Sequence, residues 1–296
     1  MTVVVAIPGS EELATKLAAR LAVDAMAPEL RSFPDGELYV RIDRSLAGHD
    51  AIVVGGLYPD PATKFLAIAF VAATAREVGA RSVGLVAPYL AFMRQDVQFK
   101  PGEGVTSSYF AKLVSGAVDW MVTVDPHLHR RDSLAGIYSI PTTVARAAPA
   151  IARWIEREVK DPVLIGPDAE SVQWVSAVAE RCGAPFAILE KTRRGDRDVS
   201  IAAGEDARAL CNGHTPVLID DIVSTGKTMV EATRQLRAAG TQPPLCVAIH
   251  AVFADDVHDE LVGAGAAGIV TCNTIAHASN KICVAESIAD AARAHV

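Results

Sequence analysis

Two adjacent acidic residues, Asp220 and Asp221, end a hydrophobic run and precede a loop of small residues in the segment VLIDDIVSTGKT at 217–228. If such a loop opens a helix, its backbone N–H groups have no intrahelical partners and suit a phosphate group. The two carboxylates suit the hydroxyls of a sugar or a bound cation. The segment therefore indicates a phosphate site flanked by acids, although aspartate, serine and threonine are also ordinary residues at strand ends and helix caps.

The last part of this segment, Gly226-Lys227-Thr228, also matches the end of a nucleotide-binding P-loop. The first glycine of the GxxxxGK[ST] pattern would fall at Asp221, so the segment is not a P-loop. The expected phosphate contacts are therefore those of the loop and of the helix that follows it.

His127 and Asp168 are further candidates, because each follows a hydrophobic run, Trp120–Asp125 in one case and Val163–Gly166 in the other. A single histidine is more often a structural residue than a ligand. One carboxylate together with phosphate oxygens is a typical magnesium site. The charged stretch LEKTRRGDRD at 189–198, taken alone, is typical of a solvated connection between two strands.

Short β-branched runs that alternate with Ala-rich helical patterns must position these residues. The runs do not alternate in polarity, which is typical of strands buried on both faces of parallel sheets. The predicted strands are Val3–Ile7, Ala51–Gly55, Ser82–Pro88, Trp120–Asp125, Val163–Gly166, Pro185–Leu189, Val217–Asp221, Leu245–Ala251 and Gly268–Cys272. The predicted helices include Glu11–Leu21, Pro61–Val78, Val144–Glu158, Ser171–Arg181 and Thr228–Ala239. Alternating polarity over Leu38–Ile42, after the turn Pro34-Asp35-Gly36, predicts a half-exposed strand.

The β/α units are too many for one open sheet of usual width, so the choice lies between a closed barrel and two domains. A second start after Thr143, with a long helix, the run VLIGPD and another helix, favours two domains. We expect an α/β protein with doubly wound, mainly parallel sheets, divided into residues 1–145 and 146–296, with the last helix able to pack back on the first domain. Ligands of such sheets bind at the carboxyl ends of the strands.

Composition excludes several classes of protein. The 296 residues are 50% hydrophobic and 21% charged, which excludes a disordered chain. The net charge of −7 argues against a generic nucleic-acid-binding protein. The longest uncharged apolar stretch, Phe65–Ala75, is too short to span a bilayer, and no signal peptide is recognisable, so no membrane association is expected. Five cysteines without a CxxC pair indicate reduced thiols and a cytoplasmic protein.

The 217–228 segment resembles the 5-phosphoribosyl-1-pyrophosphate (PRPP) loop of the phosphoribosyltransferase-like fold. Six further blocks resemble segments of ribose-phosphate pyrophosphokinase, also called PRPP synthetase, and occur in the order of that family. They are RSFPDGELYVRI (31–42), PYLAFMRQD continued by FKPGE (88–103), VDPHLH (124–129), GPD (166–168), EKTR (190–193) and VTCNTI (270–275). The chain is identified as a member of this family, closest in pattern to its archaeal-type members, with two similar phosphoribosyltransferase-like domains.

The resemblance assigns ATP to the first domain. The implied ATP-binding residues are Phe33, Asp35, Glu37, Arg94, Gln95, Asp96 and His127. An aromatic ring can stack on the base, acids can accept hydrogen bonds from its exocyclic amine, and arginine and glutamine can donate to phosphate oxygens. In the family the FPDGE segment reaches the nucleotide of a neighbouring subunit, which implies a homo-oligomer with its active site near a subunit interface.

The resemblance assigns ribose 5-phosphate to the second domain, where Asp220 and Asp221 would hold the ribose hydroxyls or its metal. The residues implied to cradle the 5-phosphate are Ser224, Thr225, Gly226, Lys227 and Thr228. His127 and Asp168 are implied ligands of Mg²⁺, and the role of His129 is ambiguous.

Lys191 and Arg193, in the charged stretch, are the implied catalytic residues, because mobile cations stabilise the negative charge that spreads over a transferring diphosphoryl group. The implied reaction converts ATP and ribose 5-phosphate to PRPP and AMP by attack of the anomeric hydroxyl on the β-phosphorus. One alternative is a phosphoribosyltransferase that consumes PRPP, which would not need the FPDGE and EKTR blocks. Another is a catalytically silent associated subunit, against which the presence of His127, Asp168, Lys191 and Arg193 argues.

Ser224 and Lys227 depart from the pattern of many bacterial and animal members, which carry an acid and a glycine there. The serine is similar to archaeal-type members, whereas Lys227 adds a charge beside the expected 5-phosphate. The chain is also shorter than the phosphate-activated, ADP-inhibited class usually is, so that regulation is not carried over to it.

Overall fold

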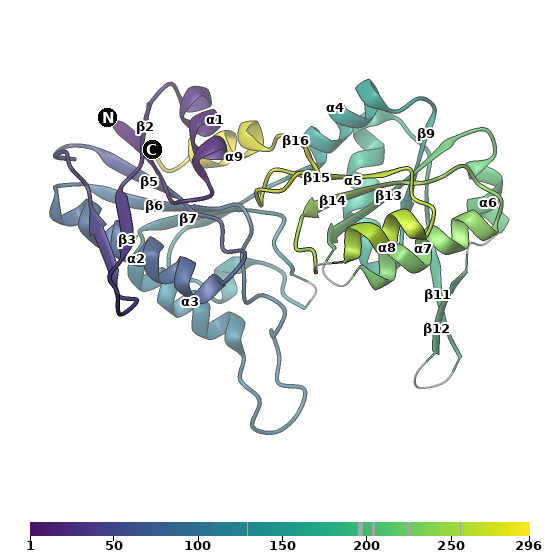
Figure 1. Cartoon of the computed structure of the whole chain (residues 1–296), viewed down its shortest axis with the longest axis horizontal. Coiled ribbons are helices and arrows are strands. Elements are labelled where there is room, and N and C mark those ends of the chain that lie inside the picture. The colour runs from purple at the N-terminus through teal and green to yellow at the C-terminus, as the bar shows by residue number, and fades with distance from the viewer. Residues whose placement is uncertain (129, 195–197, 203–204, 224–225, 255) are drawn as a thin grey trace. The chain divides into compact units, whose positions relative to one another are not determined.

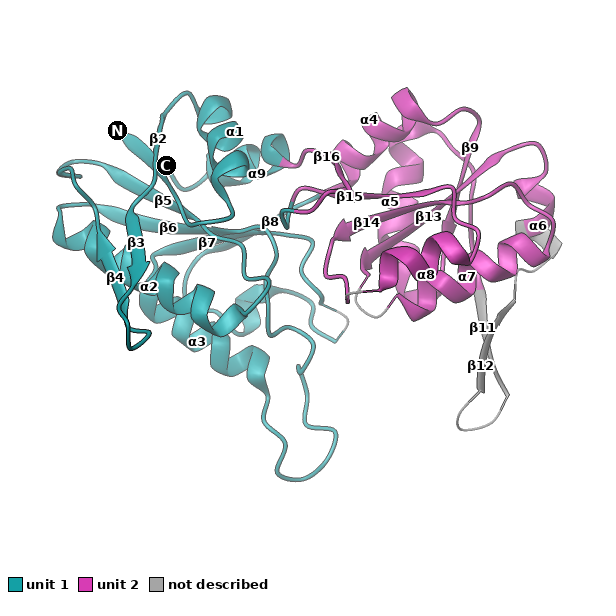
Figure 2. Ribbon diagram, in the orientation of Figure 1, with its two compact units in different colours: residues 1–146, 274–276, 285–296 teal, residues 147–273, 277–284 magenta. Residues whose placement is uncertain are grey.

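A computed structural model of the chain shows two compact units, each built on a sheet of its own (Figures 1 and 2). It describes every residue except 129, 195–197, 203–204, 224–225 and 255, and of 190–194, 198–202 and 205–207 it describes the backbone only. Unit 1 comprises Met1–Arg146, Thr274–Ala276 and Ala285–Val296. Unit 2 comprises Ala147–Asn273 and His277–Val284. The C-terminal helix therefore belongs to unit 1.

Six parallel strands form the sheet of unit 1, in the order β2-β1-β5-β6-β7-β8. In chain order these strands are β1 (Thr2–Ala6), β2 (Asp24–Met26), β5 (Asp50–Val54), β6 (Ser82–Ala87), β7 (Trp120–Val124) and β8 (Thr142–Ala145). The helical segments of this unit are α1 (Glu11–Leu21), α2 (Pro61–Glu77), α3 (Thr106–Ala117), η1 (Leu134–Gly136) and α9 (Ala285–Ala292). Strands β3 (Glu29–Ser32) and β4 (Leu38–Arg41) form a separate antiparallel hairpin.

The sheet of unit 2 also has six parallel strands, in the order β10-β9-β13-β14-β15-β16. In chain order these strands are β9 (Pro162–Gly166), β10 (Phe186–Ile188), β13 (Thr215–Ile222), β14 (Leu245–His250), β15 (Gly268–Cys272) and β16 (Asn280–Ile282). The helical segments are α4 (Ala148–Glu158), η2 (Ala169–Ser171), α5 (Val172–Cys182), α6 (Glu205–Cys211), α7 (Lys227–Ala238) and α8 (Val257–Gly263). Strands β11 (Glu190–Arg194) and β12 (Asp198–Ala202) pair as an antiparallel hairpin.

Both units follow one plan. In each, the second strand forms one edge of the sheet, an antiparallel hairpin comes next in the chain, and the remaining four strands extend the sheet on the other side. The two open sheets confirm the predicted fold of two similar, doubly wound parallel domains and exclude a closed barrel. In unit 1, β2 lies on one side of β1 and the later strands, from β5 on, lie on the other side. In unit 2, β10 and β13 flank β9 in the same way. The positions between β1 and β5 and between β9 and β13 are therefore the topological switch points, where open α/β sheets bind ligands.

The predicted strands are all present, with bounds that differ by at most a few residues. Most of them are central strands, because long hydrophobic runs that are buried on both faces form such strands, whereas Pro185–Leu189 contains the edge strand β10. The predicted start of the helix Val144–Glu158 is wrong. Val144 pairs with Thr123 of β7 as part of β8, and α4 begins only at Ala148, with Pro149 in its first turn. The charged stretch at 189–198, predicted to be a connection between two strands, contains β11 and the first residue of β12, which pair as a hairpin.

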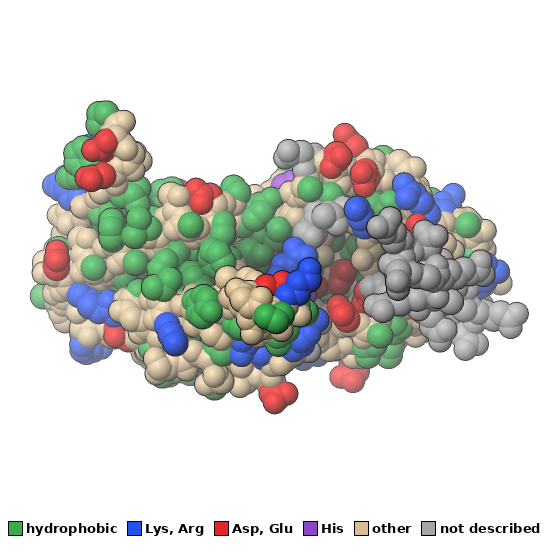
Figure 3. Space-filling model, turned by 90° about the horizontal axis from the view of Figure 1, so that it is seen from below, with side chains coloured by type: hydrophobic (Ala, Val, Ile, Leu, Met, Phe, Trp, Pro, Cys, Tyr) green, Lys and Arg blue, Asp and Glu red, His purple; other side chains and the backbone are tan. Residues whose placement is uncertain are grey.

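Each unit buries a hydrophobic core of its own against its sheet. In unit 1 large hydrophobic side chains also remain exposed on the outer faces of α2 and α3, and apolar side chains gather on this face in Figure 3. They are Leu66, Phe70, Tyr109 and Leu113, which are 45%, 41%, 55% and 58% exposed. None of the helices that the structure describes is long and apolar enough to cross a bilayer.

Candidate active site

Three carboxylates of unit 2 come from the two strands that meet at its switch point. Asp168 follows the end of β9, and Asp220 and Asp221 lie in the last part of the neighbouring strand β13. Because the two strands run parallel and pair side by side, their carboxyl ends meet at the same edge of the sheet. The fold therefore brings together acids that are 52 residues apart in the sequence (168 and 220).

Local hydrogen bonds hold the backbone around the first of these acids. Asp168 is buried, and its Oδ1 accepts a hydrogen bond from the backbone N–H of Glu170 at 3.0 Å, as the N-cap of η2. Its carbonyl oxygen accepts from the Ser171 hydroxyl at 2.5 Å. The acid therefore has a fixed position at the end of β9.

The electrostatics of the neighbouring strand are unusual. Burial raises the pKa of Asp220 well above its ordinary value, and the negative charges of Asp221 and Asp168 raise that pKa further. A backbone hydrogen bond from Asp221 to Asp220 Oδ1, at 3.0 Å, opposes the shift only in part. A cation, or a donor such as a sugar hydroxyl, would relieve this repulsion, so the arrangement suits either ligand.

The loop after β13 leads into α7 through Gly226, whose positive φ of 67° favours glycine. A Cβ atom at this position would lie 2.6 Å from Cγ1 of Val257, so a side chain could not be added without displacing that residue. No described side chain caps the N-terminus of α7, which leaves the N–H groups of its first turn directed toward the loop. Lys227 is exposed there and Thr228 is half-buried.

Two of the residues predicted to cradle a 5-phosphate, Ser224 and Thr225, lie outside the described residues, and so does His129. The side chains of Lys191 and Arg193 also lie outside the described part of the chain. Their backbone forms part of β11, opposite Ile201 and Val199 of β12.

The base of that hairpin is tied to the sheet beside Asp168. The backbone N–H of Leu189, just before β11, donates to the carbonyl of Gly166 at 2.8 Å, and the Leu189 side chain is buried. The hairpin therefore starts from the carboxyl edge of β9, next to the carboxylate cluster.

In unit 1 the FPDGE segment forms the turn of the β3–β4 hairpin and is exposed along its length. The Phe33 ring is 41% exposed, and the guanidinium carbon of Arg31 lies 4.9 Å from its centroid and 4.0 Å from that of Tyr39. Asp35 Oδ1 accepts from the backbone N–H of Glu37 at 3.1 Å, which shapes the turn. The hairpin thus presents an aromatic ring and two acids to a ligand or to another chain.

The loop after β6 carries Arg94, Gln95 and Asp96, which differ in exposure. Arg94 is exposed and Gln95 half-buried, whereas Asp96 is buried and its Oδ1 accepts from Nη1 of Arg130 at 3.1 Å. Arg94 and Gln95 are therefore placed to meet a ligand. Asp96, predicted from the resemblance to contact ATP, faces a residue of its own unit.

His127 follows β7 and is half-buried. The preceding Asp125 is buried, has a positive φ of 32°, and accepts from Nη1 of Arg146 at 2.9 Å. This ion pair and the bond from the Asp125 N–H to the Ala145 carbonyl, at 3.1 Å, fix the turn that carries the histidine. His127 therefore lies at the carboxyl edge of the sheet of unit 1.

The switch point of unit 1 differs from that of unit 2, because its own acids occupy the backbone donors. Glu11 Oε2 accepts from the N–H of Gly9 at 2.8 Å, and Asp60 Oδ1 accepts from the N–H of Thr63 at the start of α2 at 3.3 Å. This contact with Thr63 also lowers the pKa of Asp60. A phosphate would have to displace these carboxylates, so the sugar-phosphate chemistry is expected in unit 2 alone.

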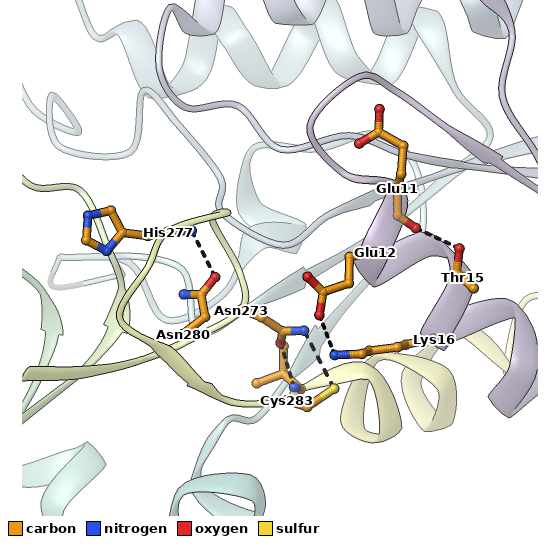
Figure 4. A network of polar contacts seen from close by, with 9 residues as sticks. Glu11, Glu12, Thr15, Lys16, Asn273, His277, Asn280 and Cys283 are labelled. Carbon is orange, nitrogen blue, oxygen red and sulfur yellow. Dashed lines mark hydrogen bonds and ion pairs between the residues drawn. The ribbon is translucent and has the colours of Figure 1, made fainter.

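The late block VTCNTI lies on β15 and the turn that follows it, where side-chain amides connect neighbouring segments (Figure 4). Asn273 Oδ1 accepts from the N–H of Val284 at 2.9 Å, and its amide nitrogen donates to Sγ of Cys283 at 3.6 Å. Asn280 Oδ1 accepts from the N–H of His277 at 3.0 Å. The asparagines therefore shape the connection between β15 and β16.

Comparison with known proteins covers nearly the whole chain. A family model for the N-terminal domain of ribose phosphate pyrophosphokinase matches residues 2–117, and one for the phosphoribosyl transferase domain matches residues 136–287. The curated ribose-phosphate pyrophosphokinase of Methanopyrus kandleri is 33% identical over 98% of both chains. The chain belongs to the ribose-phosphate pyrophosphokinase family. A second relative in this family, from Sulfolobus acidocaldarius, is 33% identical over 88% of this chain and 90% of its own.

A solved structure agrees with this membership in the ribose-phosphate pyrophosphokinase family. Phosphoribosylpyrophosphate synthetase from Mycobacterium smegmatis matches the chain with a TM-score of 0.83 and 26% identity, over 99% of this chain and 98% of that one. The family, the enzyme class and the fold predicted from the sequence blocks are thus confirmed. The match to a dedicated N-terminal domain argues against a phosphoribosyltransferase that only consumes PRPP.

The described residues of this family member contain no group of three or more His, Cys, Asp or Glu side chains arranged to hold a metal ion by themselves. A divalent metal that keeps substrate phosphates among its ligands needs only one or two protein side chains. The carboxylates at the switch point of unit 2 fit such a metal, because a cation would neutralise the negative charge that helps to raise the pKa of Asp220.

The residues that hold the site in shape were not predicted from the sequence. Arg130 and Arg131, between the VDPHLH block and η1, bond the loop after β6, and Arg146 bonds Asp125. Arg130 and Arg131 come directly after a recognised block, whereas Arg146 is far from any block. In neither case does the sequence show which carboxylate or carbonyl the arginine reaches.

Proposed function

We propose that the chain transfers the β,γ-diphosphoryl group of ATP to the 1-hydroxyl of ribose 5-phosphate, giving PRPP and AMP. The sugar oxygen bonds to the β-phosphorus, the bond from that phosphorus to the oxygen bridging the α-phosphate breaks, and AMP leaves. Family membership supports the reaction. The single observation that carries the sugar side is the cluster of Asp168, Asp220 and Asp221 beside the start of α7, which no described side chain caps.

On the ATP side, the exposed hairpin turn supports stacking of the adenine on Phe33, with Asp35 and Glu37 accepting from its exocyclic amine. Arg94 and Gln95 donate to the phosphate oxygens. Asp96 contributes by holding this loop through its buried carboxylate.

We propose that the divalent metal is Mg²⁺, for which His127 in unit 1 and Asp168 in unit 2 are each a candidate ligand, in each case beside substrate phosphate oxygens. When bound, the metal neutralises phosphate charge and aligns the attack. Asp220 and Asp221 hold the ribose hydroxyls or the metal that accompanies them, and Lys191 and Arg193 neutralise the charge of the transition state.

The direct test is incubation with ATP, Mg²⁺ and ribose 5-phosphate, followed by measurement of AMP and PRPP. We expect equal amounts of both products, and neither when any one component is omitted. Formation of ADP in place of AMP would indicate transfer of the γ-phosphoryl group instead. Absence of all products would support the catalytically silent associated subunit.

Replacing Lys227 with glycine is expected to raise the KM for ribose 5-phosphate about fivefold with little change in kcat, since an exposed ammonium contributes modestly beside a phosphate. The effect should shrink as salt is raised, because exposed charge contacts are screened. Arg234→Ala, which removes an exposed charge farther along α7, is the control. An unchanged KM at low salt would show that Lys227 points away from the phosphate.

We propose that the chain forms a homo-oligomer in which the FPDGE turn lies near a subunit interface. Exposed apolar side chains on α2 and α3, Leu66, Phe70, Tyr109 and Leu113, support assembly, because large apolar patches mark interaction surfaces. We also propose a cytoplasmic location, which the five free thiols support.

A further inference from the structure

We infer that Arg131 is a positioning residue for ATP, which fastens the loop carrying Arg94 and Gln95 to the first turn of α3. The inference rests on the proposed function, in which these two residues donate to ATP phosphates. Arg131 lies outside every block that resembles the family, so nothing in the sequence comparison assigns it a role.

One nitrogen of Arg131 connects two separate segments of unit 1. Its Nη2 lies 3.0 Å from the carbonyl oxygen of Asp96, 3.0 Å from Oγ of Ser107 and 3.2 Å from Oγ of Ser108. Asp96 ends the Arg94–Gln95 stretch, whereas the two serines belong to the first turn of α3. The guanidinium therefore bridges the loop and the helix.

Two further contacts hold the same stretch. The N–H of Ser107 donates to the carbonyl of Gln95 at 3.2 Å, and Ser107 is fully buried. Nη1 of Arg130 donates to the buried carboxylate of Asp96 at 3.1 Å. The carbonyl of Gln95 is thus bonded to α3. The carbonyl and the carboxylate of Asp96 are bonded to the segment after His127.

The far end of the loop is shaped independently of Arg131. The carboxylate of Glu103 accepts from the N–H groups of Phe99 and Lys100, at 2.9 and 3.0 Å. The tip therefore keeps its turn when the bridge is removed. What the bridge controls is the placement of Arg94 and Gln95 relative to α3.

The contacts of Arg131 point to positioning and not to direct binding. Its Nη2 hydrogens are shared among three protein oxygens, and its Nε is buried with no acceptor among the described residues. Donors that must meet phosphate oxygens need placement to within a fraction of an ångström. Loss of the bridge is therefore expected to weaken ATP binding, while ribose 5-phosphate, assigned to unit 2, is bound as before.

The test compares Arg131→Ala, Arg131→Lys and the double variant Ser107→Ala/Ser108→Ala with the unchanged chain. ATP affinity is measured by calorimetry, and KM is measured for both substrates. We expect Arg131→Ala to raise the Kd and KM for ATP about tenfold. The KM for ribose 5-phosphate should stay within about twofold. The double serine variant, which keeps every charge, should raise the same two constants about threefold.

Arg131→Lys keeps the charge but not the planar group that spans three acceptors, so it should recover the ATP affinity only in part, at low and high salt alike. Arg157→Ala, which removes an exposed arginine of α4, is the matched control. Full recovery by lysine, or normal ATP affinity in Arg131→Ala or in the serine variant, would overturn the inference. An equal rise in the KM for ATP and for ribose 5-phosphate would also overturn it. If the unchanged chain binds ATP but forms no PRPP, the proposed function fails while the calorimetric test of the bridge still stands.

Discussion

Replacing Lys191 or Arg193 with alanine is expected to lower kcat for PRPP formation about 100- to 1,000-fold, the usual loss when one donor to a charged transition state is removed. The KM for ATP should change little, because the contact forms as negative charge develops on the transferring group and not in the ground state. Steady-state kinetics of each variant with both substrates give the two constants separately. The β11–β12 hairpin that carries these residues starts beside Asp168, at the carboxyl edge where the sugar is expected to bind.

Arg194→Ala is the matched control, because it removes a charge from the same strand at a position with no assigned role. Its kcat should stay within about twofold of the unchanged chain. Near-normal turnover in both Lys191→Ala and Arg193→Ala would remove the catalytic role from this hairpin. A loss of equal size in the control would point to a disturbed hairpin instead of two catalytic cations.

Replacing Asp220 with asparagine should raise the KM for ribose 5-phosphate at least about tenfold and leave ATP affinity unchanged, because this carboxylate is assigned to the sugar side. In the unchanged chain that KM should fall as pH rises through the raised pKa of Asp220, since the ionised carboxylate is the stronger acceptor for hydroxyls and the form that binds a cation. The asparagine variant should lose this pH dependence. Measuring KM for both substrates across the pH range tests both expectations.

Stability supplies a readout that separates a binding role from a folding role. An acid whose pKa is higher in the folded state than in the unfolded state lowers the free energy of unfolding as pH rises from its unfolded to its folded pKa. Asp220→Asn removes that penalty, so its Tm at neutral pH should equal or exceed that of the unchanged chain. Asp259→Asn, at an exposed acid of α8, is the control. A lower Tm with equal loss of both affinities would show that Asp220 acts through the fold or through a metal shared by both substrates.

The repeated plan of the two units gives the recognised blocks a common placement. The FPDGE turn and the EKTR block lie on antiparallel hairpins inserted after the second strand of their respective sheets. The same position in the topology thus carries the residues proposed to contact adenine in one unit and those proposed to be catalytic in the other. In unit 2 no described side chain caps the start of α7, the helix after β13. In unit 1 Asp60 caps the start of α2, the helix after β5.

The sequence by itself determined the central strands, the family and the positions of the chemical blocks. Buried β-branched runs such as Val217–Ile219 form strands wherever they are covered on both faces, and a glycine such as Gly226 marks a backbone with positive φ. These properties depend on residues that are neighbours in the chain. The short edge strands β2, β8 and β16 are only partly buried and carry no long hydrophobic run, so the sequence did not predict them.

Only the tertiary structure decided which polar groups meet. It buried Asp220 and brought Asp168 and Asp221 near it, which together raise the pKa of Asp220. It also placed the buried carboxylate of Asp96 beside Arg130, 34 residues away in the sequence. It also placed α9 in unit 1, which the sequence allowed but did not require. The physical reason is that a buried charge takes whichever partner packing places within hydrogen-bonding distance, and packing is fixed by contacts between segments far apart in the chain.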